Sequence, residues 1–355
     1  MPEQLDLFAS LAAGTEPPKP AVPDTFTAAP RATAPAPRAR QSTGPAPRPE
    51  RVSMPHPSEG AHRRAMSIAE DVAAAWFKQH GSHRIEMPIG LVAALTLVRQ
   101  KDESGPDLAQ QILAQQPRQL LVMYRDIWAT HWMQRPDLID RARILHDWLN
   151  GDVDEQHLHL IRRVTETALK RGLLTLTGHA DPYHRSETDI LSPLIMMMRS
   201  HGAQQGLGEY HTPAPVADAM AEAVLHGLSV ELTNIVKSPE AGEHIHDPAS
   251  GTGGLIRSAA QSIRHRGLNP HHFQWSMVDV DPIAAACAAV NAIVWDLGPR
   301  VTVACDDSLA NPNAVQDAMR EARAVFEHRD SVISCARILA AARKTQQVLE
   351  EVTAA

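Results

Sequence analysis

The chain has 355 residues, enough for two ordinary domains with separate cores, and 43% of them are hydrophobic, so we expect globular structure. We find no apolar run near the ~20 residues that a transmembrane helix requires and no secretory signal at the N-terminus. These features predict a cytoplasmic protein. The net charge of −7 argues against a chain that holds DNA unaided, and it favours a local basic patch or a partner subunit.

Neither the cysteines nor the histidines follow a pattern typical of a metal site. The 3 cysteines have no CxxC spacing, which fits a reducing compartment and disfavours a zinc site or a disulfide framework. Among the 19 histidines, His157 and His159 are expected on different faces of a helix, and His244 and His246 are expected to flank a strand in isolation. We therefore expect no metal ligand in the chain.

Residues 1–66 are expected to form a disordered tail. Pro, Ala, Arg, Ser and Thr dominate the sequence from about residue 11 to residue 60. Such a composition buries too little apolar surface to offset the entropy lost on ordering. The tail is therefore interpreted as a tether that is partly in the polyproline conformation.

The first residues of this tail contain a short recognition motif. The sequence QLDLF resembles the pentapeptide with which bacterial replication and repair proteins dock on the sliding clamp, and a disordered tether would leave it accessible. The alternative is an amphipathic stub without a partner, because five residues match easily by chance. The residues of this candidate clamp peptide are Gln4, Leu5, Asp6, Leu7 and Phe8.

Residues 67–187 are expected to form an all-helical domain. Ser67 and Glu70 have the spacing of a capping box ahead of an apolar stripe. The tryptophans on such stripes are interpreted as core residues rather than as a platform for stacked bases. Proline or glycine separates the further helices, which are expected at residues 88–99, 107–115, 118–133, 136–149 and 154–171.

Residues 188–355 are expected to form an α/β domain with a truncated parallel sheet. After helices at 188–200 and 214–225, three strands are expected within EHIHDPAS, FQWSMVDVD and VTVACDDS. Helices at 253–266 and 283–295 separate the strands. This alternation is the order of a parallel sheet with crossover connections.

The turn after the first expected strand is rich in glycine. It reads DPASGTGG, from Asp247 to Gly254, and it leads into a helix. Glycines allow backbone to approach a ligand closely, and a helix N-terminus offers N–H donors to an anionic group. The alternative is a tight strand-to-helix turn without a ligand.

Acidic residues end the other two strands. Asp279 ends the second strand, where nucleotide-binding folds place the carboxylate that accepts hydrogen bonds from ribose hydroxyls. Asp281 is the alternative for this role, or it caps the helix that starts at Pro282. Asp306 or Asp307 ends the third strand, within reach of an adenine amine. All of these carboxylates are expected at the carboxyl edge of the sheet, where open α/β sheets bind ligands.

Four motifs together resemble a known family. GEYHTP (residues 208–213), then DPASGTGG, VDVDP and CDDSL, resemble the modification subunit of type I restriction systems and, more broadly, the adenine N6 class of DNA methyltransferases. The resemblance covers residues 188–310. It implies a Rossmann-like domain that depends on S-adenosylmethionine, preceded by the all-helical domain.

The resemblance also implies roles for individual residues. The Thr-Pro loop would pack over the methionine end of S-adenosylmethionine, the glycine turn would surround that end, Asp279 would bind the ribose and Asp307 would lie near the adenine. Without the other motifs, Thr212 would read as a helix cap and Pro213 as the first helical residue. The implied cofactor-binding residues are Tyr210, Thr212, Pro213, Asp247, Pro248, Ser250, Gly251, Gly253, Asp279 and Asp307.

The chain departs from the family at the catalytic position. Family members carry Asn or Asp, two prolines and an aromatic residue after a fourth strand, and these residues bind the flipped adenine. ANPN at 310–313 lacks the second proline and the aromatic residue. DSVISCARI at 330–338 occupies the place of a fourth strand but offers Cys335, Ala336 and Arg337, before a helix at 338–352. The catalytic residues are therefore unknown.

Two interpretations remain open at this point. One is an adenine-specific DNA N6-methyltransferase that takes the missing acceptor from elsewhere or from a partner. The other is a catalytically silent subunit, which would be a cofactor-sensing or DNA-associated regulator or would have a structural role. Expected partners are DNA, a specificity or complementary methyltransferase subunit, and the sliding clamp. Either protein would be cytoplasmic and associated with the nucleoid.

Overall fold

The structure is a computed structural model, and it describes residues 59–78, 84–100, 105, 107–199, 212–226 and 240–354. The candidate clamp peptide and the rest of the chain up to residue 58 lie outside these residues, as does Tyr210. All described residues belong to one compact unit that runs from His56 to Ala355. Among them, no helix has both the length and the apolar character that a bilayer crossing demands.

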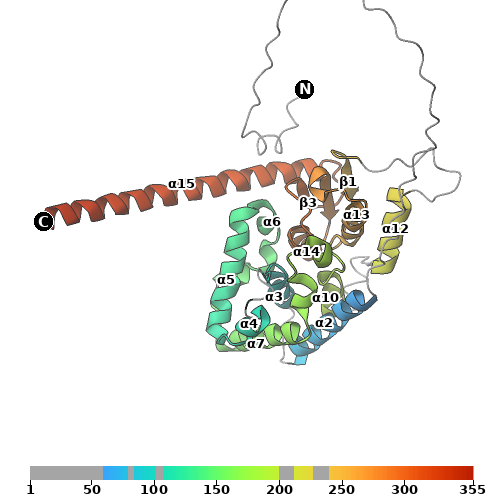
Figure 1. Ribbon diagram of the computed structural model, residues 1–355, viewed down its shortest axis with the longest axis horizontal. Helices are drawn as coiled ribbons and strands as arrows, with labels where there is room; N and C mark the ends of the chain where they lie inside the picture. The colour runs from blue at the N-terminus through green and yellow to red at the C-terminus, as the bar shows by residue number, and fades with distance from the viewer. Residues whose placement is uncertain are drawn as a thin grey trace, which may run out of the picture. The chain divides into compact units, whose positions relative to one another are not determined.

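Helices make up the first part of the described chain (Figure 1). They are α2 (Glu59–Lys78), α3 (Glu86–Thr96), α4 (Leu108–Leu113), α5 (Pro117–Gln134), α6 (Pro136–Arg141), α7 (Glu155–Lys170), α8 (Leu173–Thr177), α9 (Pro182–Arg185) and α10 (Leu191–Met198). Proline occupies a first-turn position in α5 and α6. The carboxylate of Asp154 caps α7 by accepting the backbone N–H of His157 at 2.8 Å. The expected helical region is confirmed.

The start of α2 differs from the expectation. The helix begins at Glu59, although the capping-box spacing predicts a start near Ser67. The reason is that the apolar stripe begins earlier than the capping residue suggests. Ala61 and Ala65 lie two turns and one turn ahead of Ile68, and all three side chains are buried.

A second difference concerns the segment expected as one helix at 136–149. After α6 the chain continues as two short 3-10 helices, η1 (Arg143–Leu145) and η2 (Asp147–Asn150). The His146 ring lies 3.1 Å from the carbonyl oxygen of Ile139 and takes the place of a helical N–H donor there. Side-chain contacts of this kind are not visible in an apolar periodicity.

Three parallel strands form the sheet, in the order β1 (His244–Asp247), β2 (Gln274–Asp279) and β3 (Val301–Cys305). His246 lies opposite Ser276, and Asp279 lies opposite Cys305. Helix α12 (Ala214–His226) precedes β1, and α13 (Gly254–His265), η3 (Pro270–His272) and α14 (Pro282–Val294) connect the strands. The expected α/β domain with a small parallel sheet is confirmed.

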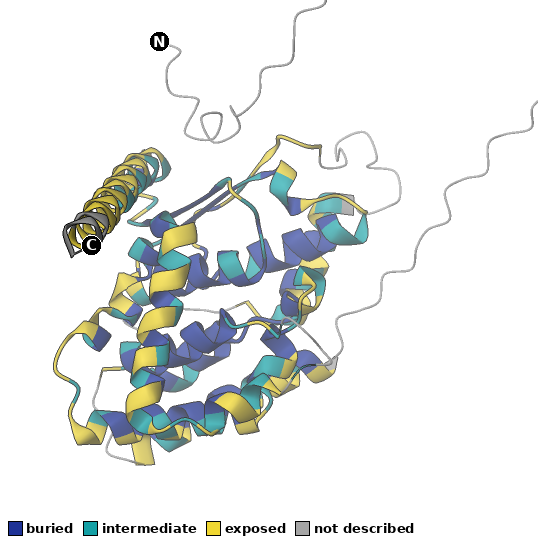
Figure 2. Ribbon diagram, turned by 60° about the vertical axis from the view of Figure 1, so that its left-hand side comes forward, coloured by how far each residue is buried: buried dark blue, intermediate teal, exposed yellow. Residues whose placement is uncertain are grey.

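The two faces of the sheet belong to different cores. Trp275, Met277 and Val303 join the main apolar cluster, which also contains side chains of α13, α14 and the preceding helices. Val278 of β2 faces the other way and joins a smaller cluster with Ala304 of β3 and with the first turns of α15 (Ala314–Ala354). Figure 2 shows the main cluster as the buried interior of the helical layers. The period-two alternation of β2 therefore fixes which face meets the helical region.

The end of the described chain is helical where the family pattern would place a fourth strand. Helix α15 runs without interruption over 41 residues, Ala314–Ala354, and includes the segment DSVISCARI. No glycine or proline interrupts this range, and alanine, arginine, glutamate and glutamine, all good helix formers, outweigh the few β-branched residues. Side chains in its second half are mostly exposed (Figure 2). Local helix propensity thus prevails where the family pattern suggested a strand.

The helical region and the sheet share their core. One apolar cluster runs from α2 through α10 to β3. Three arginines of the helical region also donate to carbonyl groups near the sheet: Arg135 to Gly298 at 2.9 Å, Arg141 to Val303 at 3.1 Å, and Arg185 to Val294 at 2.8 Å. The division of the chain at residues 187 and 188 stays a prediction, and packing joins the two parts.

Candidate functional site

The glycine turn has a backbone that only glycine adopts readily. Gly251 and Gly253 have φ values of 54° and 92°, in the left-handed region. A Cβ atom at Gly253 would lie 3.1 Å from Sδ of Met277 and 3.2 Å from Cζ3 of Trp295. Both the dihedral angle and the close packing therefore require glycine at position 253, directly before α13.

Asp279 connects the end of β2 to this turn. Its Oδ2 atom accepts the backbone N–H of Gly251 at 2.7 Å, and its Oδ1 atom accepts that of Asp281 at 2.9 Å. The backbone N–H of Ser250 donates to the carbonyl of Val278 at 2.9 Å. The sequence-predicted glycine turn and the acidic end of β2 are thus brought together at the carboxyl edge of the sheet.

Asp281 caps the following helix, as one of the two sequence interpretations expected. Its carboxylate accepts the backbone N–H groups of Ile283 at 3.2 Å and Ala284 at 2.9 Å at the start of α14. The guanidinium of Arg199 also pairs with it. These bonds occupy both oxygens of Asp281 and leave Asp279 as the carboxylate that touches the glycine turn.

The end of β3 lies next to Asp279. The backbone N–H of Asp306 donates to the carbonyl of Asp279 at 3.0 Å. Asp307 is exposed, and its Oδ1 atom accepts the N–H of Leu309 at 2.9 Å. Two apolar side chains flank these loop ends in solvent: Val280 is 61% exposed and Leu309 is 95% exposed. Exposed apolar groups beside carboxylates offer a surface to a flat, polar-edged ligand.

Two buried polar atoms at the turn have no hydrogen-bond partner among the described residues: Oδ2 of Asp247 and Oγ of Ser250. Asp247 is 8% exposed and Ser250 is 7% exposed. Burial raises the pKa of the Asp247 carboxyl, and the nearby charge of Asp279 adds to this effect. Buried polar atoms without partners are costly, so this pair calls for a donor such as an ordered water or a bound molecule.

The Thr-Pro motif lies only partly within the described residues. Thr212 and Pro213 are exposed and precede α12, and the carbonyl of Pro213 accepts the N–H groups of Val216 and Ala217. The structure therefore places Pro213 immediately before the first helical residue. The cofactor role of this motif stays a prediction.

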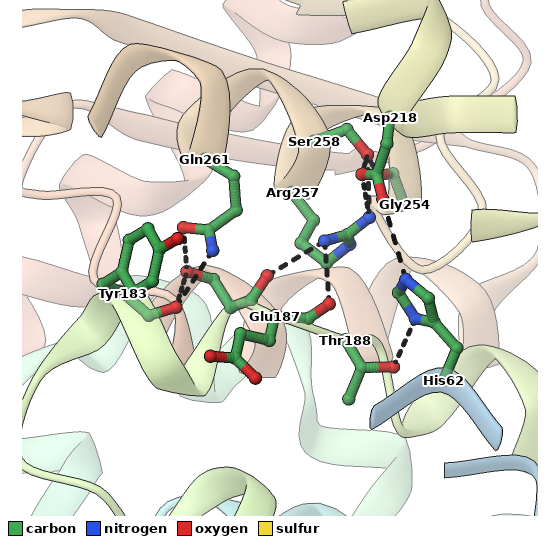
Figure 3. A network of polar contacts seen from close by, with 10 residues as sticks. His62, Tyr183, Glu187, Thr188, Asp218, Gly254, Arg257, Ser258 and Gln261 are labelled. Carbon is green, nitrogen blue, oxygen red and sulfur yellow. Dashed lines mark hydrogen bonds and ion pairs between the residues drawn. The ribbon is translucent and has the colours of Figure 1, made fainter. Parts of the chain in front are cut away.

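A polar network that the sequence did not predict anchors α12 (Figure 3). Arg257 of α13 pairs with Asp218 of α12, and the Ser258 hydroxyl lies 2.7 Å from the same carboxylate. His62 of α2 lies 3.6 Å from Asp218 and bonds to Thr188 at 2.9 Å. Burial tends to raise the pKa of Asp218, but the neighbouring His62 and the charge of Arg257 outweigh it and lower the pKa. The network therefore holds α12, which follows the Thr-Pro motif, against α13, which follows the glycine turn.

The expectation that His244 and His246 are isolated is wrong. Alternate residues of a strand share a face, and Nε2 of His244 and Nδ1 of His246 each lie 2.7 Å from the hydroxyl of Ser276 on β2. Burial and the neighbouring His246 lower the pKa of His244. Within the described ranges, no three metal-binding side chains gather at one point.

No adenine-binding tetrapeptide replaces the missing one in the described part of the chain. The amide of Asn311 donates to Asp306 at 2.6 Å and to Asp317 at 3.1 Å, which holds it at the start of α15. Cys335 and its neighbours are exposed on α15 rather than at the end of a strand. The catalytic residues stay unknown.

The match to a family model agrees with the motifs. Residues 189–326 match the sequence model of a family described as N-6 DNA Methylase. A crystal structure of a type I restriction-modification methyltransferase subunit from Streptococcus thermophilus is 15% identical, with a TM-score of 0.37 over 71% of this chain and 59% of that chain. The cryo-EM structure of a DrdV–DNA complex is 13% identical, with a TM-score of 0.38 over 77% of this chain and 27% of that chain. The present chain thus spans less than two thirds of either protein.

Proposed function

Because residues 189–326 match the sequence model of the N-6 DNA methylase family, we propose that the chain binds S-adenosylmethionine at the carboxyl edge of its sheet and serves adenine-specific N6 methylation of DNA. S-adenosylmethionine supplies an electrophilic methyl group on a sulfonium. The residues of this chain bind and orient that molecule. DNA and a specificity or complementary methyltransferase subunit are the proposed partners, in the cytoplasm.

The observation that carries the proposal is the pair of unpartnered atoms at the glycine turn. A methionine ammonium has three N–H donors, and Oδ2 of Asp247 and Oγ of Ser250 are buried acceptors without a donor among the described residues. A cation near Asp247 would also offset the burial that raises the pKa of its carboxyl. The left-handed backbone at Gly251 and Gly253 sets the path of the turn that follows Pro248, along which the methionine chain would lie.

The adenosine part fits the next two strand ends. Each oxygen of Asp279 accepts one backbone N–H and keeps a further lone pair, which a ribose hydroxyl can use. Val280 and Leu309 have exposed apolar side chains, which would pack on an adenine ring, with Asp307 beside its amine. Tyr210, Thr212 and Pro213 would cover the methionine end.

The absent tetrapeptide favours a second candidate function. A subunit that binds the cofactor without transferring the methyl group would keep the glycine turn and Asp279 but need no adenine acceptor. An active enzyme would take that acceptor from a distant residue or from a partner chain. The two candidates share the cofactor site and differ only in methyl transfer.

Calorimetric titration with S-adenosylmethionine tests the shared site. We expect Asp279→Ala to weaken binding at least about tenfold, because a hydrogen bond to a charged group contributes about 1.5–3 kcal/mol. Asp152→Ala, at an exposed carboxylate of the helical region, is the matched control and should bind like the wild type. Absence of binding by the wild type, or an unchanged affinity of Asp279→Ala, would refute the cofactor site.

Transfer of radiolabelled methyl groups to DNA that lacks methylation separates the two candidates. Incorporation at adenine N6, alone or with a partner subunit, identifies the enzyme. Cofactor binding without incorporation under either condition identifies the silent subunit.

A further inference from the structure

A buried carboxylate lies beneath the glycine turn. Asp189 precedes α10 and is 7% exposed. Its Oδ2 atom accepts the hydroxyl of Thr252 at 2.5 Å, and its Oδ1 atom accepts the side-chain amide of Asn291 at 3.1 Å. The backbone N–H groups of Leu191 and Ser192 donate to Oδ1 at 2.9 and 3.2 Å. Four donors from three segments of the chain therefore converge on one side chain.

Thr252 is held through both its side chain and its backbone. It stands between the two glycines with left-handed φ, it is 2% exposed, and its carbonyl accepts the amide of Asn291 at 2.9 Å. Asp189 and Asn291 therefore restrain the middle of the turn from the protein interior. The opposite end of the turn is held by Asp279, through Gly251.

A role limited to filling space does not account for these groups. Apolar side chains of similar size would fill the same volume without the cost of burying a carboxylate. A fully satisfied polar network instead fixes one backbone geometry, which a binding site needs when its acceptors must meet a ligand at hydrogen-bond distance. Asp247 and Ser250 lie on the same turn and are the acceptors that such restraint would orient.

We propose that Asp189, acting through Thr252 and Asn291, is a positioning residue that sets the glycine turn for the methionine end of the cofactor. This inference rests on the proposed cofactor site. It assigns the network to one half of the ligand, because the turn faces the amino-acid part while Asp279, Val280 and Leu309 face the nucleoside.

Two ligands that differ only in the amino-acid part test the assignment. S-adenosylhomocysteine carries the amino-acid chain, and 5′-methylthioadenosine lacks its ammonium and carboxylate. Thr252→Val removes the hydroxyl at nearly constant shape, and Thr252→Ser retains the hydroxyl as the matched control. Calorimetry on the full chain gives six dissociation constants, one for each ligand with the wild type and with each of the two variants. A melting curve shows that each variant is folded.

We expect Thr252→Val to weaken the binding of S-adenosylhomocysteine about tenfold, the change that follows loss of one charge-assisted hydrogen bond. The dissociation constant of 5′-methylthioadenosine should change less than about twofold. Thr252→Ser should match the wild type with both ligands. If Thr252→Val does not fold, Asn291→Leu is measured in its place, because it removes the donor to both Asp189 and the Thr252 carbonyl.

Other outcomes overturn the inference. Equal weakening of both ligands would show a general structural role, and no weakening of either would show that the network does not act on binding. If either of these outcomes is found while the wild type binds both ligands and Asp279→Ala weakens the binding of both, the proposed function stands and only the inference fails. A wild type that binds neither ligand would refute the proposed function itself.

Discussion

Gly253 offers a test of the strand-to-helix turn that does not depend on any ligand. The perturbation is Gly253→Ala, which adds one Cβ atom at a residue with φ of 92°. A left-handed backbone costs an alanine about 1–2 kcal/mol. The new atom would also lie 3.1 Å from Met277 and 3.2 Å from Trp295, closer than the 3.5–4.0 Å of an optimal carbon contact.

Crowding of this kind adds about 1–3 kcal/mol in a well-packed core, so the total loss in the free energy of unfolding is about 2–5 kcal/mol. Two other glycines separate the contributions. Gly267 has φ of 72° and open space around its Cβ position, so Gly267→Ala should cost only the backbone contribution of about 1–2 kcal/mol. Gly254 has open space and lies at the start of α13, so Gly254→Ala should change stability by less than about 1 kcal/mol.

Urea-induced unfolding followed by tryptophan fluorescence measures all three variants on one scale. The expected order of stability is Gly254→Ala, then Gly267→Ala, then Gly253→Ala. A Gly253→Ala variant no less stable than Gly267→Ala would show that Met277 and Trp295 do not confine the turn, and the reasoning from close packing would fail.

Further predictions concern charge and the N-terminal motif. Asp247 must be ionised to bind an ammonium, and its pKa is raised. The affinity for S-adenosylhomocysteine, measured by calorimetry across pH, should therefore fall as the pH drops through this raised pKa. The affinity of Asp247→Asn should not change over the same pH range. The free energy of unfolding should have the opposite pH dependence. It should fall as the pH rises through the raised pKa of Asp247, because the buried carboxyl then becomes charged. Arg257→Met should cost about 3–5 kcal/mol in urea unfolding, because it leaves Asp218 without its buried partner, and a loss below about 1 kcal/mol would contradict the pairing. Leu7→Ala with Phe8→Ala should abolish retention on an immobilised sliding clamp, and unchanged retention would eliminate the candidate clamp peptide.

The site features that depend on local sequence were predictable. A glycine turn between a strand and a helix, and carboxylates at the ends of the next strands, follow from short patterns, and the structure joins Gly251 to Asp279 as the topology requires. The capping role of Asp281 also follows from its position one residue before Pro282. Parallel strands bring such motifs to one edge without further information.

Features that depend on distant partners were not predictable. Asp189 meets Thr252 from 63 positions away along the chain, and Arg257 meets Asp218 from 39 positions away. In a single sequence each of these four residues is only a polar residue in a helix or next to one, and nothing indicates its partner. The only local signal is that Arg257 interrupts the buried side of α13, where a charged residue needs a partner.

The segment at residues 330–338 shows where the family resemblance did not predict the structure. In the family pattern, residues 330–338 occupy the place of a fourth strand, and in the structure they lie within α15. Among these residues the hydroxyl of Ser334 bonds to the carbonyl of Asp330 one turn earlier, a contact typical of a helix. A resemblance carried by the first three strands gave no information about the segment after them.

The shared core has a practical consequence for shortening the protein. A fragment limited to residues 189–326 would leave α14 without α3 and α6, and three backbone carbonyls would lose their arginine donors. The apolar face of α14 would then be exposed to water, which promotes aggregation. A soluble expression fragment should therefore start no later than Glu59, even though the residues that match the methylase family begin 130 positions further on.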